Sequence, residues 1–170
     1  MINKTEIEKA QNSWGNGIIT IGKLKDNPKE CRIFTVNFIS KHYDFDSGDV
    51  QFKPTKASEK QFRNNNKSAL SYFIGSDNDF AEDKGFALNP WVQVEFDNCS
   101  INIYDDIATA MGNYFFTDPS GGKTKVEFSF VYKKNKEGEI KIVLHHSSLP
   151  FRMWVYSCTD SAFVWTQLIN

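Results

Sequence analysis

The chain has 170 residues, of which 40% are hydrophobic, and its 20 basic and 21 acidic residues give a formal net charge of -1. This length suits one domain with a real core, and the balanced charge gives no support for a nucleic-acid or anionic-membrane partner. Cys31, Cys99 and Cys158 are widely spaced and form no CxxC pair, so neither a disulfide framework nor a thiolate zinc site is predicted. The charged N-terminal segment and the absence of a long apolar run predict a soluble protein. We expect it in the cytoplasm, or in an organelle interior after removal of a targeting segment.

Two helices are predicted at the start of the chain. The second begins at Pro28, with Asp26 or Asn27 as its cap, and runs to about Tyr43. A short strand at 50–53 and a helical segment at 69–73 follow. The first helix is marked by apolar residues at three- and four-residue spacing: Ile7, Ala10, Trp14, Ile18 and Ile21.

From Trp91 onward the hydrophobic period changes to two, which is typical of strands. Turn sequences at 119–122 and 135–138 join the last three strands into an antiparallel meander. Helices first and strands later predict an α+β fold, with the helices packed on one face of a curved, mainly antiparallel sheet. We expect residues 1–170 to form a single domain. The predicted strands cover 92–96, 101–103, 107–117, 126–132 and 139–148.

A double histidine and a double serine end the last predicted strand, at His145, His146, Ser147 and Ser148. Successive strand residues point to opposite faces of a sheet. Strict alternation places His146 and Ser148 on the face of Ile140, Ile142 and Leu144. This more apolar face favours His146 and Ser148 as the pair that points into a pocket, with His145 and Ser147 as the alternative.

Five motifs occur in chain order: FKPT at 52–55, ALSYF at 69–73, EDKGFA at 82–87 leading into Pro90-Trp91, AMGNYFFT at 110–117, and HHSS at 145–148. Together they resemble the iota-class carbonic anhydrases, which belong to the nuclear transport factor 2 superfamily and are related to the association domain of calcium/calmodulin-dependent kinase. The resemblance covers about residues 14–151 and implies a cone-shaped α+β barrel. Leu149 leads directly to Pro150, where the family often has a spacer and a methionine. Residues 152–170 have no counterpart and stay unassigned.

The resemblance implies reversible hydration of CO2 to bicarbonate and a proton, in a cavity between the helices and the concave sheet face. The family's site uses a threonine, a tyrosine, and a histidine with a serine two positions later. In this chain the matching residues are Thr55 and Tyr72, which together with Ser148 would bind the substrate through their hydroxyls. The histidine and serine are either His146 with Ser148 or His145 with Ser147, and the histidine would orient a water molecule and shuttle its proton.

The residues do not favour a metal centre. Zinc that activates water typically has three protein ligands, and the chain offers only His42, His145 and His146. His145 and His146 are adjacent on a strand and point apart. We therefore expect no metal cofactor, although a zinc or manganese site made of one histidine and carboxylates stays open. The acidic loop 77–83 lacks the EF-hand pattern, so its carboxylates are expected to be solvated.

Two other classes of function stay open. One is a non-catalytic association module; the other is an isomerase or dehydratase that uses an inward carboxylate as general base. Glu95 and Glu127 alternate with apolar neighbours and are predicted to point outward, which weakens the second alternative. A homodimer is expected, with Trp91, Tyr114 and Phe116 supplying apolar area on the convex sheet face.

Overall fold

The computed structural model describes residues 1–48, 50–75, 77–151, 154–159 and 162–167. The chain has three α-helices in its described residues: α1 (Lys4–Lys23) and α2 (Pro28–His42) precede the first strand, and α3 (Asn66–Ile74) follows it. The cap of α2 is Asn27, whose side chain accepts a hydrogen bond from the backbone N–H of Glu30. Asn3 forms a capping box with Glu6 at the start of α1. The two predicted N-terminal helices are therefore confirmed.

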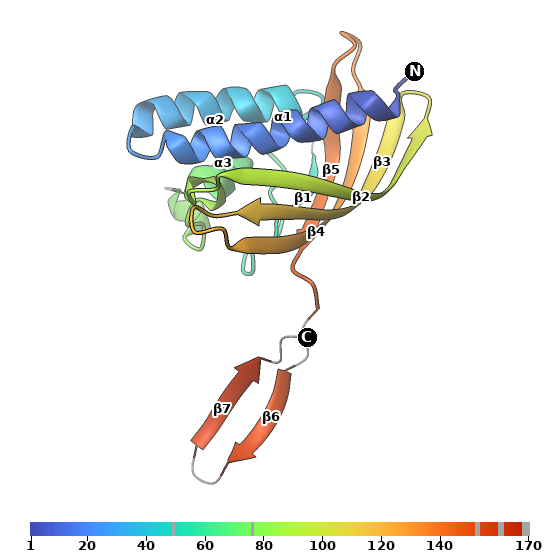
Figure 1. Cartoon of the computed structure of the whole chain (residues 1–170). Coiled ribbons are helices and arrows are strands. Elements are labelled where there is room, and N and C mark those ends of the chain that lie inside the picture. Colours follow the sequence, from blue (N-terminus) through green and yellow to red (C-terminus); the bar gives the residue numbers. More distant parts are fainter. Residues whose placement is uncertain (49, 76, 152–153, 160–161, 168–170) are drawn as a thin grey trace.

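Five strands form the main sheet: β1 (Gln51–Lys53), β2 (Gln93–Tyr104), β3 (Ile107–Thr117), β4 (Lys123–Lys134) and β5 (Ile140–Ser148). Their order is β1-β5-β4-β3-β2, with β1 parallel to β5 and the other neighbours antiparallel. The α+β class and the meander are confirmed. The sheet curls beneath α1 and α2, but its edge strands β1 and β2 do not pair with each other, so the barrel is not closed (Figure 1).

Four further elements are present, two short turns and two strands. Short 3-10 turns, η1 (Asn78–Phe80) and η2 (Phe86–Leu88), lie between α3 and β2. Within residues 152–170, for which the sequence makes no prediction, β6 (Trp154–Thr159) and β7 (Ala162–Gln167) pair antiparallel in a separate two-stranded sheet. The assignment of the whole chain to one domain stays a prediction. Along the part of the chain that the structure describes, no helix combines the length and apolarity needed to cross a bilayer.

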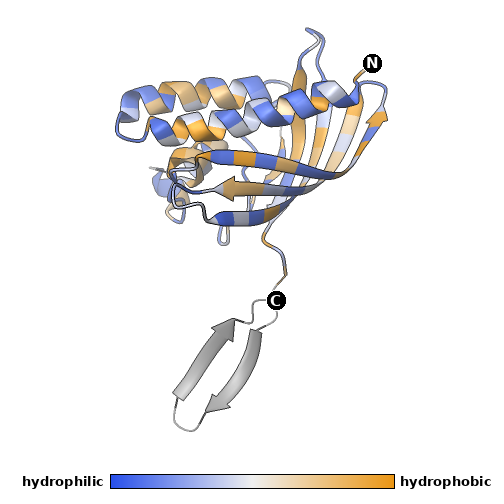
Figure 2. Cartoon of the chain, in the orientation of Figure 1, coloured by the Kyte–Doolittle hydropathy of each residue, from blue (hydrophilic) through white to orange (hydrophobic). Residues whose placement is uncertain are grey.

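The core lies between α1 and the concave face of the sheet, where apolar side chains alternate with polar ones along the strands (Figure 2). Trp14 of α1 is at its centre. Tyr114 and Phe116 of β3 pack against Trp14, with ring centroids 5.9 and 6.4 Å away. Their prediction as outward residues is wrong, because even-numbered positions of β3 face the helices. Trp91 is partly buried and packs against Phe116 of the core, so its prediction as an outward residue is wrong as well. Glu95 and Glu127 are exposed, as predicted.

A bulge in β5 decides which histidine points inward. On β4, Val131 pairs with Leu144 and the next residue, Tyr132, pairs with Ile142, so Val143 is an extra residue on β5. Ile142 and His145, three positions apart, consequently face the same core. The expectation from strict alternation is therefore wrong: His145 and Ser147 are buried, while His146 is exposed and Ser148 is on the outer side with it.

Candidate active site

His145 lies in an aromatic box on the inner face of β5. Its side chain is 2% exposed. Phe52 stacks on the imidazole at 4.7 Å between ring centroids, and Phe130 covers it at 4.2 Å. Complete burial lowers the pKa of His145 to about 3, and the neighbouring His146 adds to the effect. The imidazole of His145 is therefore neutral at neutral pH.

Tyrosine hydroxyls contact both ring nitrogens of His145. Tyr43 follows α2, and its hydroxyl oxygen lies 3.0 Å from Nδ1 of His145. That oxygen also accepts a hydrogen bond of 3.0 Å from the indole nitrogen of Trp14. On the other side, the hydroxyl oxygen of Tyr114 lies 3.4 Å from Nε2 of His145. The imidazole is thus oriented by residues from α1, the end of α2 and β3.

A cluster of hydroxyls adjoins the Nε2 side of His145. The parallel register that pairs Phe52 with His145 brings Thr55, just beyond β1, beside Ser147. Thr55 Oγ1 donates a hydrogen bond of 2.9 Å to Ser147 Oγ. Burial raises the pKa of Tyr114, although hydrogen bonds with Ser147 and Thr55 oppose the shift. Burial also raises the pKa of Tyr72, which interacts with Thr55, so both tyrosines stay protonated at neutral pH.

The structure brings together four of the six predicted site residues: Thr55, Tyr72, His145 and Ser147. The other pair is separated from them by the sheet. His146 is exposed, and Ser148 Oγ donates a hydrogen bond of 3.2 Å to Glu127 Oε2 on the outer face.

Two tyrosines of the site were missed by the sequence analysis. Tyr114 was expected on the convex face together with Phe116, which shares its face of the strand, but both side chains are buried on the inner face. Tyr43 carried no sign of its role. It ends a helical pattern, and its partner His145 is 102 positions later.

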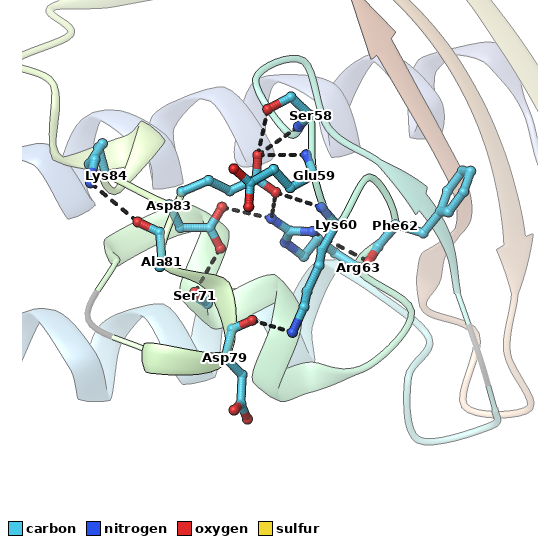
Figure 3. Close-up of polar contacts among 11 residues, drawn as sticks. Ser58, Glu59, Lys60, Phe62, Arg63, Ser71, Asp79, Ala81, Asp83 and Lys84 are labelled. Atoms are coloured by element: carbon cyan, nitrogen blue, oxygen red, sulfur yellow. Dashed lines mark hydrogen bonds and ion pairs between the residues drawn. The ribbon is translucent and has the colours of Figure 1, made fainter.

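An ion-pair network holds the loop that carries Thr55 (Figure 3). Arg63 is fully buried, and its Nη2 lies 2.8 Å from Asp83 Oδ1 and 3.4 Å from Glu82 Oε1. Backbone N–H groups of residues 58–60 donate to Glu82, which lowers its pKa to about 2. Asp83 accepts a hydrogen bond of 2.7 Å from Ser71, next to Tyr72 on α3. These carboxylates are therefore structural, and the expectation that they are solvated is wrong for both.

A cavity of about 250 Å³ lies beside Tyr72. Lys56 and Lys84 are among its lining residues, together with Phe86 and Asn89. Tyr72 interacts with Thr55 as well, so this side chain lies between the cavity and the hydroxyl cluster. Glu82 and Asp83 line the same cavity, so two carboxylates balance its two lysines.

The third histidine is outside this cluster. His42 ends α2, and its Nε2 lies 3.5 Å from Ser13 Oγ of α1. In the described ranges, no three histidine, cysteine or acidic side chains are arranged to hold a metal ion.

The fold and this site define an α+β protein with a buried imidazole and hydroxyl centre. A family model described as metal-independent carbonic anhydrase matches residues 5–149. A metal-independent carbonic anhydrase from Nostoc sp. strain PCC 7120 is 39% identical over 153 residues, which cover 88% of this chain and 75% of the relative. The chain therefore belongs to the family of metal-independent carbonic anhydrases, and the predicted family and absence of a metal cofactor are confirmed by this membership.

Solved structures agree with this assignment. The crystal structure of an iota-carbonic anhydrase from a cyanobacterium, complexed with bicarbonate, aligns with a TM-score of 0.86 and 37% identity over 89% of this chain and 94% of that chain. A putative calcium/calmodulin-dependent protein kinase II association domain from Xanthomonas campestris aligns with a TM-score of 0.57 and 21% identity over 88% of this chain and 89% of that one. At this identity the second likeness shows the fold alone.

Proposed function

We propose that the protein catalyses the reversible hydration of CO2 to bicarbonate and a proton, without a metal, at the cluster of Thr55, Tyr72, Tyr114, His145 and Ser147. The observation that carries this proposal is the joining of Thr55, Ser147 and Tyr114 to a buried, neutral His145. The bicarbonate complex of the cyanobacterial relative supports the choice of substrate.

The hydroxyl groups supply the chemistry. Each can donate and accept a hydrogen bond, so together they can hold a water molecule and the oxygens of CO2 or bicarbonate. The water oxygen forms the new bond to carbon, and one proton leaves. No cation lowers the pKa of that water, so fixed dipoles in a dry site must stabilise the developing hydroxide and bicarbonate charge. Phe52 and Phe130 beside His145 provide the apolar surroundings in which such dipoles are strong.

His145 acts in this scheme as a hydrogen-bonding group rather than as a strong base. A base is most effective when its pKa lies near the working pH, whereas burial lowers the pKa of His145 to about 3. The proton is therefore expected to leave along the hydroxyls of Thr55 and Tyr72 toward the cavity beside Tyr72 and the solvent. We expect slower turnover than a zinc enzyme achieves.

Stopped-flow measurement of CO2 hydration on protein stripped with a chelator, and checked for metals by mass spectrometry, tests the proposal. The wild type should be active, and Thr55→Val and Ser147→Ala should each lose about 10- to 100-fold, because each substitution removes one hydrogen-bonding group from the site. Ser148→Ala is the matched control and should keep full activity, since Ser148 lies on the outer face. Activity that returns only with added metal, or an inactive wild type, would contradict the proposal.

We also propose a homodimer that uses the outer face of the sheet. Met111 of β3 is 57% exposed there. A hollow of about 300 Å³ beside it is lined by Glu127, His146 and Ser148, among others. Sedimentation equilibrium should give twice the mass of the chain. Cys31 and Cys99 are free thiols, which supports the cytoplasm or an organelle interior as the compartment.

A further inference from the structure

We infer that Tyr43 is a positioning residue that, together with Trp14, fixes the tautomer of His145 so that Nε2 carries the hydrogen facing the hydroxyl cluster. The structural part of this inference stands on the contacts of three buried side chains. Its consequence for catalysis rests on the function proposed above.

The assignment begins at Trp14, because an indole nitrogen can only donate a hydrogen bond. Its acceptor is the hydroxyl oxygen of Tyr43, 3.0 Å away. Both side chains are buried, so water does not replace either partner. The oxygen of Tyr43 is thereby used as an acceptor, and its own hydrogen must find a different group.

Among the described residues, the acceptor within reach of the Tyr43 hydroxyl hydrogen is Nδ1 of His145, at 3.0 Å. A neutral imidazole has one protonated and one unprotonated nitrogen. With Nδ1 accepting from Tyr43, the hydrogen of the ring is on Nε2. In the opposite tautomer Nδ1 would donate to Tyr43, whose own hydroxyl hydrogen would then be buried without an acceptor. Leaving a buried donor unpaired should disfavour that tautomer by on the order of tenfold or more.

The backbone around Tyr43 holds the hydroxyl in this place. The N–H of Tyr43 donates to the carbonyl of Ile39 in the last turn of α2, at 2.8 Å. The N–H of Asp44 donates to the carbonyl of Ile142 on β5, at 3.0 Å. Tyr43 is thus tied both to α2 and to the strand that carries His145, so its distance to the imidazole is set by the fold.

The consequence is that His145 presents a donor to the site. Its Nε2–H points toward Tyr114, and the separation of 3.4 Å is longer than a good hydrogen bond. A bicarbonate oxygen near the hydroxyls of Thr55 and Ser147 would be a better acceptor for this N–H. Tyr43 therefore acts on the substrate through His145, without contact of its own.

The test is the protonation of each histidine nitrogen, measured by long-range nitrogen–proton NMR correlation on protein with nitrogen-15 histidine. His146→Ala and His42→Gln identify the signals of the other two histidines. In the wild type, Nδ1 of His145 should be unprotonated and Nε2 protonated. A wild type with hydrogen on Nδ1 overturns the inference, and this measurement needs no variant of Tyr43.

Tyr43→Phe then tests the cause. It keeps the ring and removes the hydroxyl, so the His145 tautomer should become mixed or reversed and the CO2 hydration rate should fall by about 10- to 100-fold. The control is Tyr132→Phe, which removes a buried hydroxyl that interacts with Gln11 and should change neither readout. A Tyr43→Phe protein with an unchanged tautomer overturns the inference. A wild type that has the Nε2–H tautomer but does not hydrate CO2 supports the tautomer inference and overturns the proposed carbonic anhydrase function.

Discussion

The two halves of the HHSS segment have the same residue types and opposite surroundings. His145 and Ser147 face the core, where the imidazole contacts Tyr43 and Tyr114 and the serine accepts a hydrogen bond from Thr55. His146 is exposed, and Ser148 bonds to Glu127 on the outer face. The position relative to the sheet, rather than the residue type, therefore gives a histidine–serine pair its chemistry here. Each inner residue also has a matched outer control.

The largest expected effect separates the two histidines. His145→Ala should lower the CO2 hydration rate by about 100- to 1000-fold, because it removes a preorganised hydrogen-bonding group from the site. His146→Ala should stay within about twofold of the wild type, since surface substitutions away from a site have small effects. Stopped-flow assays of both variants under identical conditions make the measurement.

The loss in His145→Ala must be separated from a loss of folding. His145→Phe keeps a planar ring between Phe52 and Phe130 and removes both nitrogens. It should be as inactive as His145→Ala while retaining a cooperative urea transition. If His146→Ala proved the more damaging change, the inward assignment of His145 would be refuted.

The parts of the fold with strong local signals were predictable. Pro28, preceded by Asn27 as a capping residue, predicts the start of α2. Turns that contain glycine predict the meander of β3, β4 and β5. Thr55 and Tyr72 were reached through the FKPT and ALSYF motifs. Their closeness to His145 and Ser147 could not be inferred from the sequence, because it depends on the parallel pairing of β1 with β5.

The inward pair was not predictable from alternation. A bulge adds one residue to a strand, and one residue is enough to turn every later side chain to the other face. Val143 is an ordinary strand residue, so the sequence contains no sign of the bulge it forms. Tyr43 was missed for a related reason, because its role comes from a contact between segments 102 positions apart.

A smaller effect comes from the response of the buried His145 to pH. Burial lowers the pKa of His145 to about 3, whereas an unfolded histidine titrates near 6.5. Between these values the unfolded chain binds a proton that the folded site does not, so stability is present above pH ~6.5 and is lost as the pH falls. The contribution should approach about 1.4 kcal/mol per pH unit. His42 contributes in the same direction, because burial and then the nearby Lys41 and Lys141 lower its pKa to about 3.

Urea unfolding at pH 6 and pH 5 measures this difference above the range in which most carboxylates titrate. The wild type should lose stability between the two values, and His145→Phe should show about half of that loss, which His42 supplies. Ser148→Ala is the control and should retain the full loss, because it leaves both buried histidines in place. Equal slopes for the wild type and His145→Phe would show that His145 is not buried in its neutral form.

A modest change in activity is expected from deletion of Val143, the residue that forms the bulge. With Val143 removed, Ile142 can still face inward opposite Tyr132 and Leu144 can still pair with Val131, so His145 keeps its inward position. The deletion should therefore retain CO2 hydration within about tenfold, although loss of the bulge alters the local twist of β5. Inserting one alanine after Leu144 is the matched control: it turns His145 outward, and activity should fall by about 100-fold or more, as in His145→Ala. Stopped-flow assays compare the two variants directly. An inactive deletion beside an active insertion would contradict the pairing of β5 with β4 described above.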